Sequence, residues 1–420
     1  MENLTKTVLS LFSGCGGMDL GFEGGFRVHK SSVNPKIHPT WYSNELDSDW
    51  ITLPRTSFYT IFANDILKSA ETFWQTNFPD STDQPRRFYR DSIVDLVKQA
   101  WQGTFQFPSV DVVTGGFPCQ DFSLAGNRKG FLSKKDHNGE KIADINAPTI
   151  ETRGMLYYWM RNVIELILPS VFVAENVKGL VSLGDTKKII EHDFRNVGPG
   201  YLVVEAKVLN AKNFGVPQNR ERVIFIGLRT DRLTDEAINV YSSGNVPDNY
   251  DLYPLETHGN KDNIFTNVPV LPYSTTRNYL SDLGEPSDSK DLSHQIFSRA
   301  KFYGKHCQGN REINLDEVSP TIRSEHHGNI EFRRLSAENG GGNIEELSKG
   351  YPERRLSVRE CARIQTFPDR FDFVIREGDL SRFRINGSDA YKLIGNAVPP
   401  LLAYHLASRL EHLWPLIFKE

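Results

Sequence analysis

The first half of the chain alternates between short apolar runs and longer amphipathic stretches. In residues 6–23 an apolar run leads into a glycine-rich turn and then a helical pattern, which predicts a strand, a turn and a helix. A helical pattern also covers residues 155–168. Further apolar runs predict strands over 41–44, 110–114, 171–174, 202–209 and 223–228. Because strands that alternate with helices favour a parallel sheet covered on both faces, residues 1 to about 230 are predicted to form a doubly wound α/β fold.

The periodic pattern weakens in the middle of the chain. Residues 231–296 are rich in Pro, Asn, Asp, Ser and Tyr with an acidic balance, and the stretch that follows is basic. A glycine-rich stretch over 336–350 predicts a loop, and helical patterns return over 356–365 and 399–414. A chain of 420 residues exceeds the size at which one core stops growing. We therefore expect the middle section to form a second, smaller and loop-rich domain.

Composition narrows the classes of protein. The chain is 39% hydrophobic and 24% charged, as in ordinary globular proteins. No apolar stretch approaches the roughly 20 residues of a membrane helix, and the N-terminus lacks a signal-peptide pattern, so a cytoplasmic protein without a membrane partner is expected. The 4 cysteines form no CxxC pair, which disfavours a disulfide framework and a zinc site. A net charge of −4 argues weakly against a surface that binds nucleic acid everywhere, but it permits a basic cleft.

The glycine-rich turn at residues 14–19 differs from a nicotinamide-binding fingerprint. Asp19 occupies the place of the third glycine, which counts against a nicotinamide oxidoreductase. Glu45 and Asp65 follow the next strand-like runs, where carboxylates can hold a ribose diol and an adenine amino group. Each acid alone is more often a solvated surface carboxylate. Together with the turn they favour an adenosine-containing ligand.

A cysteine, Cys119, follows Pro118 in the segment GGFPCQDFS, directly after a predicted strand. One interpretation is a small buried side chain, because free cysteine is among the most buried residue types. The other is a nucleophile held on a stiff loop at the carboxyl end of a strand. The segment by itself leaves both interpretations open.

Several sequence blocks resemble those of DNA (cytosine-5) methyltransferases and occur in that family's order. LFSGCGGMDLGF is similar to the family's cofactor loop, SNELD and NDI to its next cofactor motifs, and DVVTGGFPCQDFSLAG to its catalytic Pro-Cys loop. The blocks TRGMLYYW, AENVKGL, NFGVPQNRERVIFIG, RRLSVRECARIQTFPD and YKLIGNAVPP follow. The resemblance covers residues 8–228 and 353–405, with a gap where the family has its variable target-recognition region. A departure is Leu46, where relatives often have an aromatic residue.

The resemblance implies an enzyme with a Rossmann-like fold that transfers a methyl group from S-adenosyl-L-methionine to C5 of a cytosine in a short double-stranded DNA sequence. Cys119 would add to C6 of the base, on a loop stiffened by Pro118. Glu175 would donate a proton near N3, with a pKa raised by a partly dry pocket. Of Arg220 and Arg222, one would hold cytosine O2 and the other Glu175 or a phosphate. The target base would have to leave the duplex. Without the resemblance, Glu175 is equally explained as an ion-pair partner at the rim of the sheet.

The resemblance also implies binding residues and domain limits. The expected cofactor residues are Phe12, Gly14, Gly16, Glu45, Asp65, Ile66, Leu156 and Asn396. The expected DNA-binding residues are Gln120 and Ser123 on the cysteine loop and Arg323, His326, Arg333 and Arg334 in the middle region. Residues 1–230 and 387–420 would form the catalytic domain, 231–350 the target-recognition domain and 351–386 a hinge. No third ligand has a suitable spacing from the histidine pair at 326–327, so no metal is expected.

Two rival functions remain on this scaffold. An RNA cytosine-5 methyltransferase would have a compact middle region, and the long interval between Val223 and Leu356 favours a reader of DNA sequence. A catalytically silent DNA-binding protein would not need the intact Pro118–Cys119 pair or Glu175. A monomer that protects host DNA from a cognate restriction endonuclease is the expectation.

Overall fold

The computed structural model describes residues 5–42, 48–80, 85–118, 155–260, 269–304, 309–324, 330–378 and 382–419. The main sheet has eight strands in the order β5-β4-β1-β6-β7-β10-β8, and β9 pairs with β10. The strands are β1 (Lys6–Leu11), β4 (Phe58–Asn64), β5 (Arg87–Tyr89), β6 (Val112–Gly116), β7 (Val171–Val177), β8 (Tyr201–Val203), β9 (Lys207–Asn210) and β10 (Glu221–Arg229). Neighbours from β5 to β7 run parallel, whereas β10 is antiparallel to its partners. The predicted mostly parallel α/β fold is therefore confirmed.

The strand order reverses beside β1. From β1 the chain proceeds outward to β4 and β5 on one side and then returns to β6 and β7 on the other side. In open α/β sheets, ligands bind at the carboxyl ends of the strands where the order reverses. The loops that follow β1 and β6 border this position.

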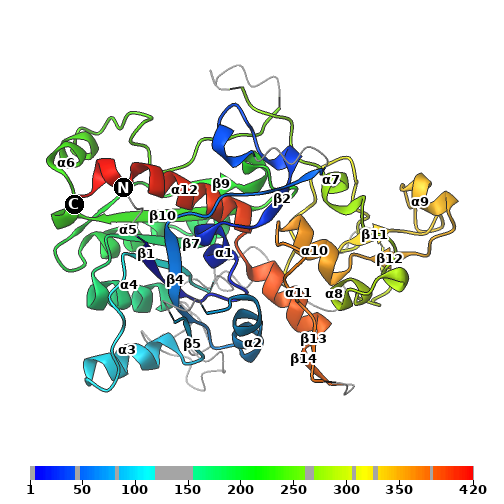
Figure 1. Cartoon of the computed structure of the whole chain (residues 1–420), viewed down its shortest axis with the longest axis horizontal. Coiled ribbons are helices and arrows are strands. Elements are labelled where there is room, and N and C mark those ends of the chain that lie inside the picture. Colours follow the sequence, from blue (N-terminus) through cyan, green and yellow to red (C-terminus); the bar gives the residue numbers. More distant parts are fainter. Residues whose placement is uncertain are drawn as a thin grey trace.

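Helices cover both faces of the sheet, and the alternation of side chains along each strand explains why. Val8 and Val112 belong to one hydrophobic core with α1, α2 and α12, whereas Leu9 and Val113 belong to a second core with α3, α4 and α5. Figure 1 shows this layered arrangement. These helices are α1 (Gly17–Glu23), α2 (Lys68–Asn77), α3 (Ile93–Trp101), α4 (Leu156–Ile167), α5 (Thr186–Arg195) and α12 (Pro400–Ile417).

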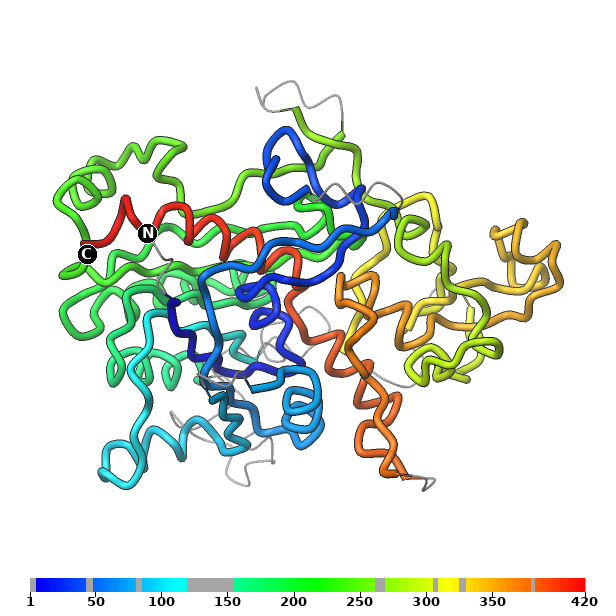
Figure 2. Tube along the Cα trace, in the orientation of Figure 1, coloured from blue at the N-terminus to red at the C-terminus, as the bar shows by residue number. Residues whose placement is uncertain are grey.

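The C-terminal helix α12 returns to the beginning of the chain and crosses α1, as the red and blue parts of the tube in Figure 2 show. Gly21 of α1 permits this close approach, because a Cβ there would lie 2.3 Å from the Cβ of Ala403. The rings of Phe26 and Tyr404 meet edge to face at 5.9 Å. The end of the chain therefore packs with its first strand and helix.

Short elements form the region beside the sheet, on the right in Figure 1. They are α7 (Thr276–Leu280), α8 (Leu292–Gln295), β11 (Phe332–Arg334), α9 (Ile344–Ser348), β12 (Arg354–Arg355), α10 (Val358–Ile364), β13 (Ile375–Arg376), β14 (Phe383–Ile385) and α11 (Gly387–Asn396). By contrast, α6 (Asp235–Ser242) lies near the end of α12, where Leu233 bridges to Phe418. The expected domain limits stay predictions.

The structure corrects two expected strands. Within the predicted strand over 41–44, the described residues begin with the end of a 3-10 turn, Pro39–Trp41, whose proline fixes φ and lacks an N–H for a ladder. The second strand of the main sheet is β4, which ends directly before Asp65, where the sequence indicated the end of a strand, and β2 (Arg27–His29) pairs with β3 (Trp50–Thr52) outside the sheet. The predicted strand over 202–209 is divided into β8 and β9, which both pair with β10.

Candidate active site

The loop after β1 turns sharply and is fixed by a carboxylate from the neighbouring strand. Phe12 and Gly14 have φ angles of 54° and 55°. The N–H of Gly14 donates to the Asp65 carboxylate at 3.1 Å, and the N–H of Leu67 donates to the same group at 2.9 Å. A Cβ on Gly14 would have no atom within 4 Å, so the backbone there borders open space. A ligand can therefore approach the backbone closely at this glycine.

The end of α11 lies against this glycine loop. The Cys15 thiol donates to the carbonyl oxygen of Leu393 at 3.4 Å. A Cβ on Gly17 would lie 2.2 Å from the carbonyl oxygen of Val398. Asn396, between these two contacts in the chain, is exposed. The structure thus brings together three of the expected cofactor positions, which are Gly14, Asp65 and Asn396.

The other expected cofactor residues differ in how much surface they offer. Ile66 is 42% exposed beside Asp65, as an apolar ligand contact requires. Leu156 is only 4% exposed and packs in the hydrophobic core, which leaves little of it for a ligand. Gly16 is also buried, because its Cα faces the ring of Phe78. Glu45 lies outside the described residues.

Glu175 on β7 stands directly beside the strand that leads into the cysteine loop. β6 and β7 are parallel neighbours, and their register pairs Gly116 with Glu175. A Cβ on Gly116 would lie 2.8 Å from a Glu175 carboxylate oxygen, so a side chain at this position would displace the carboxylate. The side-chain amide of Asn176 donates to the carbonyl oxygen of Phe117 at 3.0 Å. The loop therefore leaves β6 in a fixed direction next to Glu175.

Arg222 holds the other side of the Glu175 carboxylate, as one of the two expected arginine roles requires. Its Nε lies 2.7 Å from a Glu175 oxygen, and the two side chains are 10% and 8% exposed. Burial raises the pKa of Glu175, and the positive charges of Arg222 and Arg220 oppose that rise. The predicted rise in the pKa of Glu175 is confirmed in direction.

The cysteine loop begins at the edge of the described residues. Pro118 follows β6 by two positions and is partly buried. Cys119, Gln120 and Ser123 lie outside the described residues, so their expected roles stay predictions.

Arg220 was expected to contact either the base, Glu175 or a phosphate, but in the structure its guanidinium binds backbone carbonyls. Its side chain is fully buried. The guanidinium donates to the carbonyl oxygens of Ile322, Gly395 and Ala397 at 2.9, 2.6 and 2.8 Å. Both Nη atoms of Arg220 therefore bind backbone carbonyls, which favours a structural role for this residue. The expected catalytic contact of Arg220 with the base stays a prediction.

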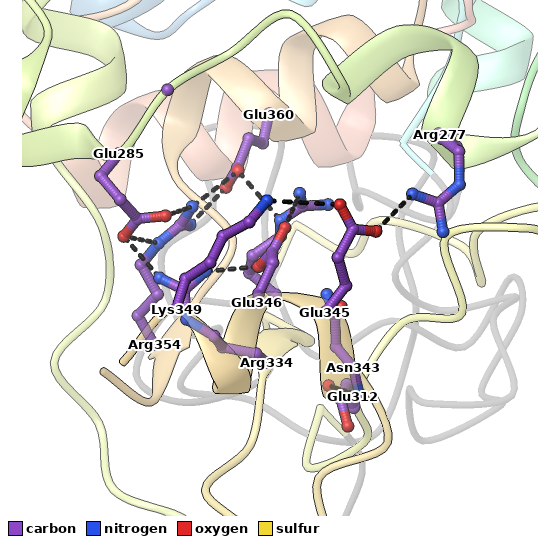
Figure 3. A network of polar contacts seen from close by, with 12 residues as sticks. Arg277, Glu285, Glu312, Arg334, Asn343, Glu345, Glu346, Lys349, Arg354 and Glu360 are labelled. Atoms are coloured by element: carbon purple, nitrogen blue, oxygen red, sulfur yellow. Dashed lines mark hydrogen bonds and ion pairs between the residues drawn. The ribbon is translucent and has the colours of Figure 1, made fainter. Parts of the chain in front are cut away.

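Arg333 and Arg334 also differ from the expectation that they bind DNA. They are 5% and 0% exposed and lie on β11, where both pair with Glu346 of α9. Arg334 also pairs with Glu285 at 2.5 Å, and Glu285 and Glu360 flank Arg354 in the same ion-pair network (Figure 3). Buried, paired guanidinium groups hold the fold of this region and do not offer donors to DNA.

Arg323 remains accessible among the expected DNA-binding residues. Its side chain is 28% exposed, and its Nη1 lies 3.7 Å from a carboxylate oxygen of Glu331. His326 lies outside the described residues.

Sequence reasoning missed Gly116, although the glycine pair at 115–116 before Pro118 was the available signal. Only the pairing of β6 with β7 shows that this glycine makes room for Glu175. Within the described ranges, no cluster of His, Cys, Asp or Glu is arranged to hold a metal ion. The helices in the same part of the chain are too short or too polar to span a membrane.

Comparisons with known proteins agree with this geometry. The model of the family of C-5 cytosine-specific DNA methylases matches residues 6–412. The Type II methyltransferase M.BsuRI of Bacillus subtilis is 34% identical over 431 residues, covering 98% of this chain and 80% of the relative. The Type II methyltransferase M.BspRI of Lysinibacillus sphaericus is 31% identical over 416 residues, covering 96% of this chain and 81% of that protein.

Solved structures share the fold at lower identity. The S. pombe Dnmt2 methyltransferase is similar with a TM-score of 0.53 and 17% identity, over 98% of this chain and 99% of that chain. The Entamoeba histolytica methyltransferase EhMeth has a TM-score of 0.51 and 15% identity, over 99% of each chain. These similarities concern the arrangement of the sheet and its helices.

Proposed function

This chain belongs to the family of C-5 cytosine-specific DNA methylases and is a DNA (cytosine-5) methyltransferase, and we propose that it uses a covalent thiol adduct to methylate a cytosine extruded from duplex DNA. The observation that carries the proposal is the contact of the Glu175 carboxylate with Gly116, three positions before Cys119. An acid held beside a thiol loop, at the reversal of strand order, suits a reaction that needs a nucleophile and a proton donor together.

S-adenosyl-L-methionine supplies an electrophilic methyl group when it is bound. The described residues fit such a molecule: the backbone at Gly14 borders open space, Asp65 holds that loop, and Ile66 and Asn396 are exposed nearby. Asp65 and Ile66 would hold the adenine end, while Asn396 would hold a polar group. Glu45 would bind the ribose diol, and Phe12 and Gly16 would shape the loop.

The chain's residues then act on the cytosine ring. The Cys119 thiolate sulfur forms a bond to C6, the C5–C6 π electrons move toward C5, and N3 takes a proton from Glu175. C5 then accepts the methyl group, the bond from that carbon to the sulfonium sulfur breaks with its electron pair on sulfur, and S-adenosyl-L-homocysteine is the leaving group. A base removes the C5 proton, and the electrons of that C–H bond restore the C5–C6 double bond while the sulfur–C6 bond breaks. N3 returns its proton to Glu175, so the thiolate and the acid are regenerated.

Arg222 keeps the Glu175 carboxyl in place during this cycle through its 2.7 Å contact. A cytosine within a duplex cannot reach a group enclosed like Glu175, which is 6% exposed. The base therefore has to swing out of the helix, at a cost of about a few kcal/mol. Arg323, and His326 outside the described residues, would contact the DNA from the recognition side.

We extend the proposal to the setting of the reaction. The Type II methyltransferases among the relatives support a modification enzyme that protects host DNA from a restriction endonuclease. Such an enzyme would act as a monomer in the cytoplasm, on the DNA of the nucleoid.

The experiment that tests the chemistry is the trapping of a covalent adduct. Duplex DNA with 5-fluorocytosine blocks removal of the C5 substituent, so the wild type with S-adenosyl-L-methionine should form a stable protein–DNA complex. Cys119→Ser should bind DNA, form no adduct and lose methyl transfer by several orders of magnitude. Undiminished turnover in that variant would remove Cys119 from the mechanism. Methylation of tRNA but not duplex DNA would replace the DNA assignment by the RNA alternative.

A further inference from the structure

The end of α11 is held by side chains from separate parts of the chain. Helix ends leave carbonyl groups that the helix itself cannot satisfy. Here the donors are Cys15 to Leu393, Gln365 to Ile394, and Arg220 to Gly395 and Ala397. The exposed Asn396 lies within this held segment. Its orientation toward a ligand therefore depends on these donors.

Arg220 makes one further contact, to residues 319–324, which we call the recognition segment because it contains Arg323, a residue expected to bind DNA. The guanidinium of Arg220 donates to the carbonyl oxygen of Ile322 at 2.9 Å. The same segment runs beside residues 217–220: the N–H of Ile322 donates to the Gln218 side chain at 3.1 Å, and Gln218 bridges to Ser319. Arg323 within this segment is the accessible one among the described residues that are expected to bind DNA.

Gly395 brings the two segments into direct backbone contact. A Cβ on Gly395 would lie 2.2 Å from the carbonyl carbon and oxygen of Arg323 and 2.3 Å from the nitrogen of Ser324. No side chain larger than hydrogen fits between them. A movement of the recognition segment toward α11 would therefore push on Gly395, and a movement away would stretch the hydrogen bond from Arg220 to Ile322.

We propose that Arg220 is a positioning residue that couples DNA binding at the recognition segment to cofactor binding at Asn396. One planar fork binds both segments at once, which a point charge such as lysine cannot reproduce. DNA that holds residues 319–324 in one arrangement also holds the end of α11 in one arrangement. DNA binding then already orders part of the cofactor site, so the cofactor loses less conformational entropy of the protein when it binds.

The inference rests on the proposed function and makes a quantitative claim about two ligands. Coupling between two sites is reciprocal, so DNA should strengthen cofactor binding by the factor by which cofactor strengthens DNA binding. Coupling of this kind typically amounts to about 5- to 150-fold. The factor is a ratio of affinities within one variant, and a general loss of stability cancels from it.

The experiment compares three variants of the full chain. Arg220→Lys keeps the charge but not the fork, and Gly395→Ala separates the segments while Arg220 is intact. Arg409→Lys is the matched control, because Arg409 on α12 donates to the carbonyl oxygens of Asp251 and Asp248 at 2.7 and 2.5 Å, away from both segments. Calorimetry gives the Kd for S-adenosyl-L-homocysteine with and without a duplex that carries the site found by bisulfite sequencing of DNA from expressing cells.

The wild type and Arg409→Lys should show the same coupling, of about fivefold or more. Arg220→Lys and Gly395→Ala should bring the ratio close to unity and raise the KM for both substrates more than they lower kcat. Wild-type coupling in either of these two variants would overturn the inference, as would a wild type that methylates DNA without coupling. A wild type that produces no 5-methylcytosine would instead overturn the proposed function.

Discussion

Arg222 Nε lies 2.7 Å from a carboxylate oxygen of Glu175, across two antiparallel strands of the main sheet. Burial and the charge of Arg222 shift the pKa of Glu175 in opposite directions. Burial of Glu175 favours its neutral form, and the guanidinium favours its ionised form. The net rise in the pKa of Glu175 means that burial has the larger effect, which suits a group that must donate a proton.

This opposition predicts the pH dependence of methyl transfer. If protonated Glu175 is the donor, kcat is highest below its pKa and falls as the pH rises through that value. Arg222→Met removes the charge that lowers the pKa of Glu175, so the alkaline limb should move to higher pH. In Glu175→Gln the decrease of kcat at alkaline pH should disappear, and kcat itself should fall by about 10²- to 10⁴-fold. Transfer of a tritiated methyl group, measured across pH, gives each profile.

The control for this profile is the exposed pair at the end of the same two strands. Lys178 lies 2.7 Å from Glu221, and their side chains are 58% and 40% exposed. Lys178→Met should leave the position of the alkaline limb unchanged. A limb that stays in place in Arg222→Met would remove Glu175 as the titrating group.

Asp65→Asn should weaken cofactor binding, because the Asp65 carboxylate holds the glycine loop through the N–H of Gly14 and is itself oriented by the N–H of Leu67. Hydrogen bonds to charged groups contribute about 1.5–3 kcal/mol, so the Kd for S-adenosyl-L-homocysteine should rise by about tenfold or more. Calorimetry measures this change. Asp111→Asn is the matched control, since Asp111 holds the N–H of Thr7 at 2.8 Å at the opposite end of β1. An equal rise in Kd in both variants would contradict a specific role for Asp65.

The strands of the sheet were predictable because each is a short apolar run that can be recognised in the local sequence. β7 and β10 were expected almost as they are. The strand predicted over 41–44 was wrong, because Pro39 begins a 3-10 turn and Trp41 is buried by contacts with α12 that local sequence does not record. The order of the strands, and hence the meeting of Gly116 with Glu175, appears only in three dimensions.

The candidate site was predictable where a residue acts through its place in a motif. Asp65 and Asn396 lie where the motifs suggested, around the glycine loop. The roles of the arginines were not predictable, because a guanidinium looks the same in sequence whether it faces solvent or backbone carbonyls. Arg220 and Arg334 are buried by partners at Ile322 and Glu285, far away in the chain.

Glu360→Gln should destabilise the region of Figure 3 strongly. The Glu360 side chain is 1% exposed and pairs with Arg354 at 2.8 Å, and the arginine charges hold the pKa of Glu360 at about 2 although burial opposes this. Removal of one partner from a buried ion pair costs about 3–5 kcal/mol. Denaturant unfolding followed by circular dichroism measures the loss. Because the pKa of Glu360 is lowered in the fold, its contribution is present above the unfolded value and is lost as the pH falls toward 2.

The matched control lies in the same network. Glu345 contacts Arg277 and Lys349 at 3.5 and 3.3 Å, and its side chain is 62% exposed. Glu345→Gln should change the free energy of unfolding by less than about 1 kcal/mol. Similar losses in the two variants would mean that burial does not determine the strength of these ion pairs.

A cluster of one half-buried and two buried histidines predicts that the protein loses stability below neutral pH. His38 stacks on Trp41, and its ring centroid lies 5.2 Å from that of His405. Burial lowers the pKa of His38 and of His258 to about 4, and it lowers the pKa of His405, on which both neighbours also act by charge repulsion. These histidines are neutral in the fold, so unfolding takes up protons once the pH falls below the unfolded value of 6.5.

Each of these histidines should reduce the free energy of unfolding by up to about 1.4 kcal/mol per pH unit between pH 6.5 and 4. His405→Phe keeps a ring against Trp41 and Phe214 and removes one proton uptake, so the free energy of unfolding should fall less steeply with pH. Denaturant titrations across this pH range measure the slope. His412→Phe changes an exposed residue of the same helix and serves as the control. An unchanged slope in His405→Phe would show that His405 is already protonated in the folded protein, because only a residue that gains its proton on unfolding contributes to the slope.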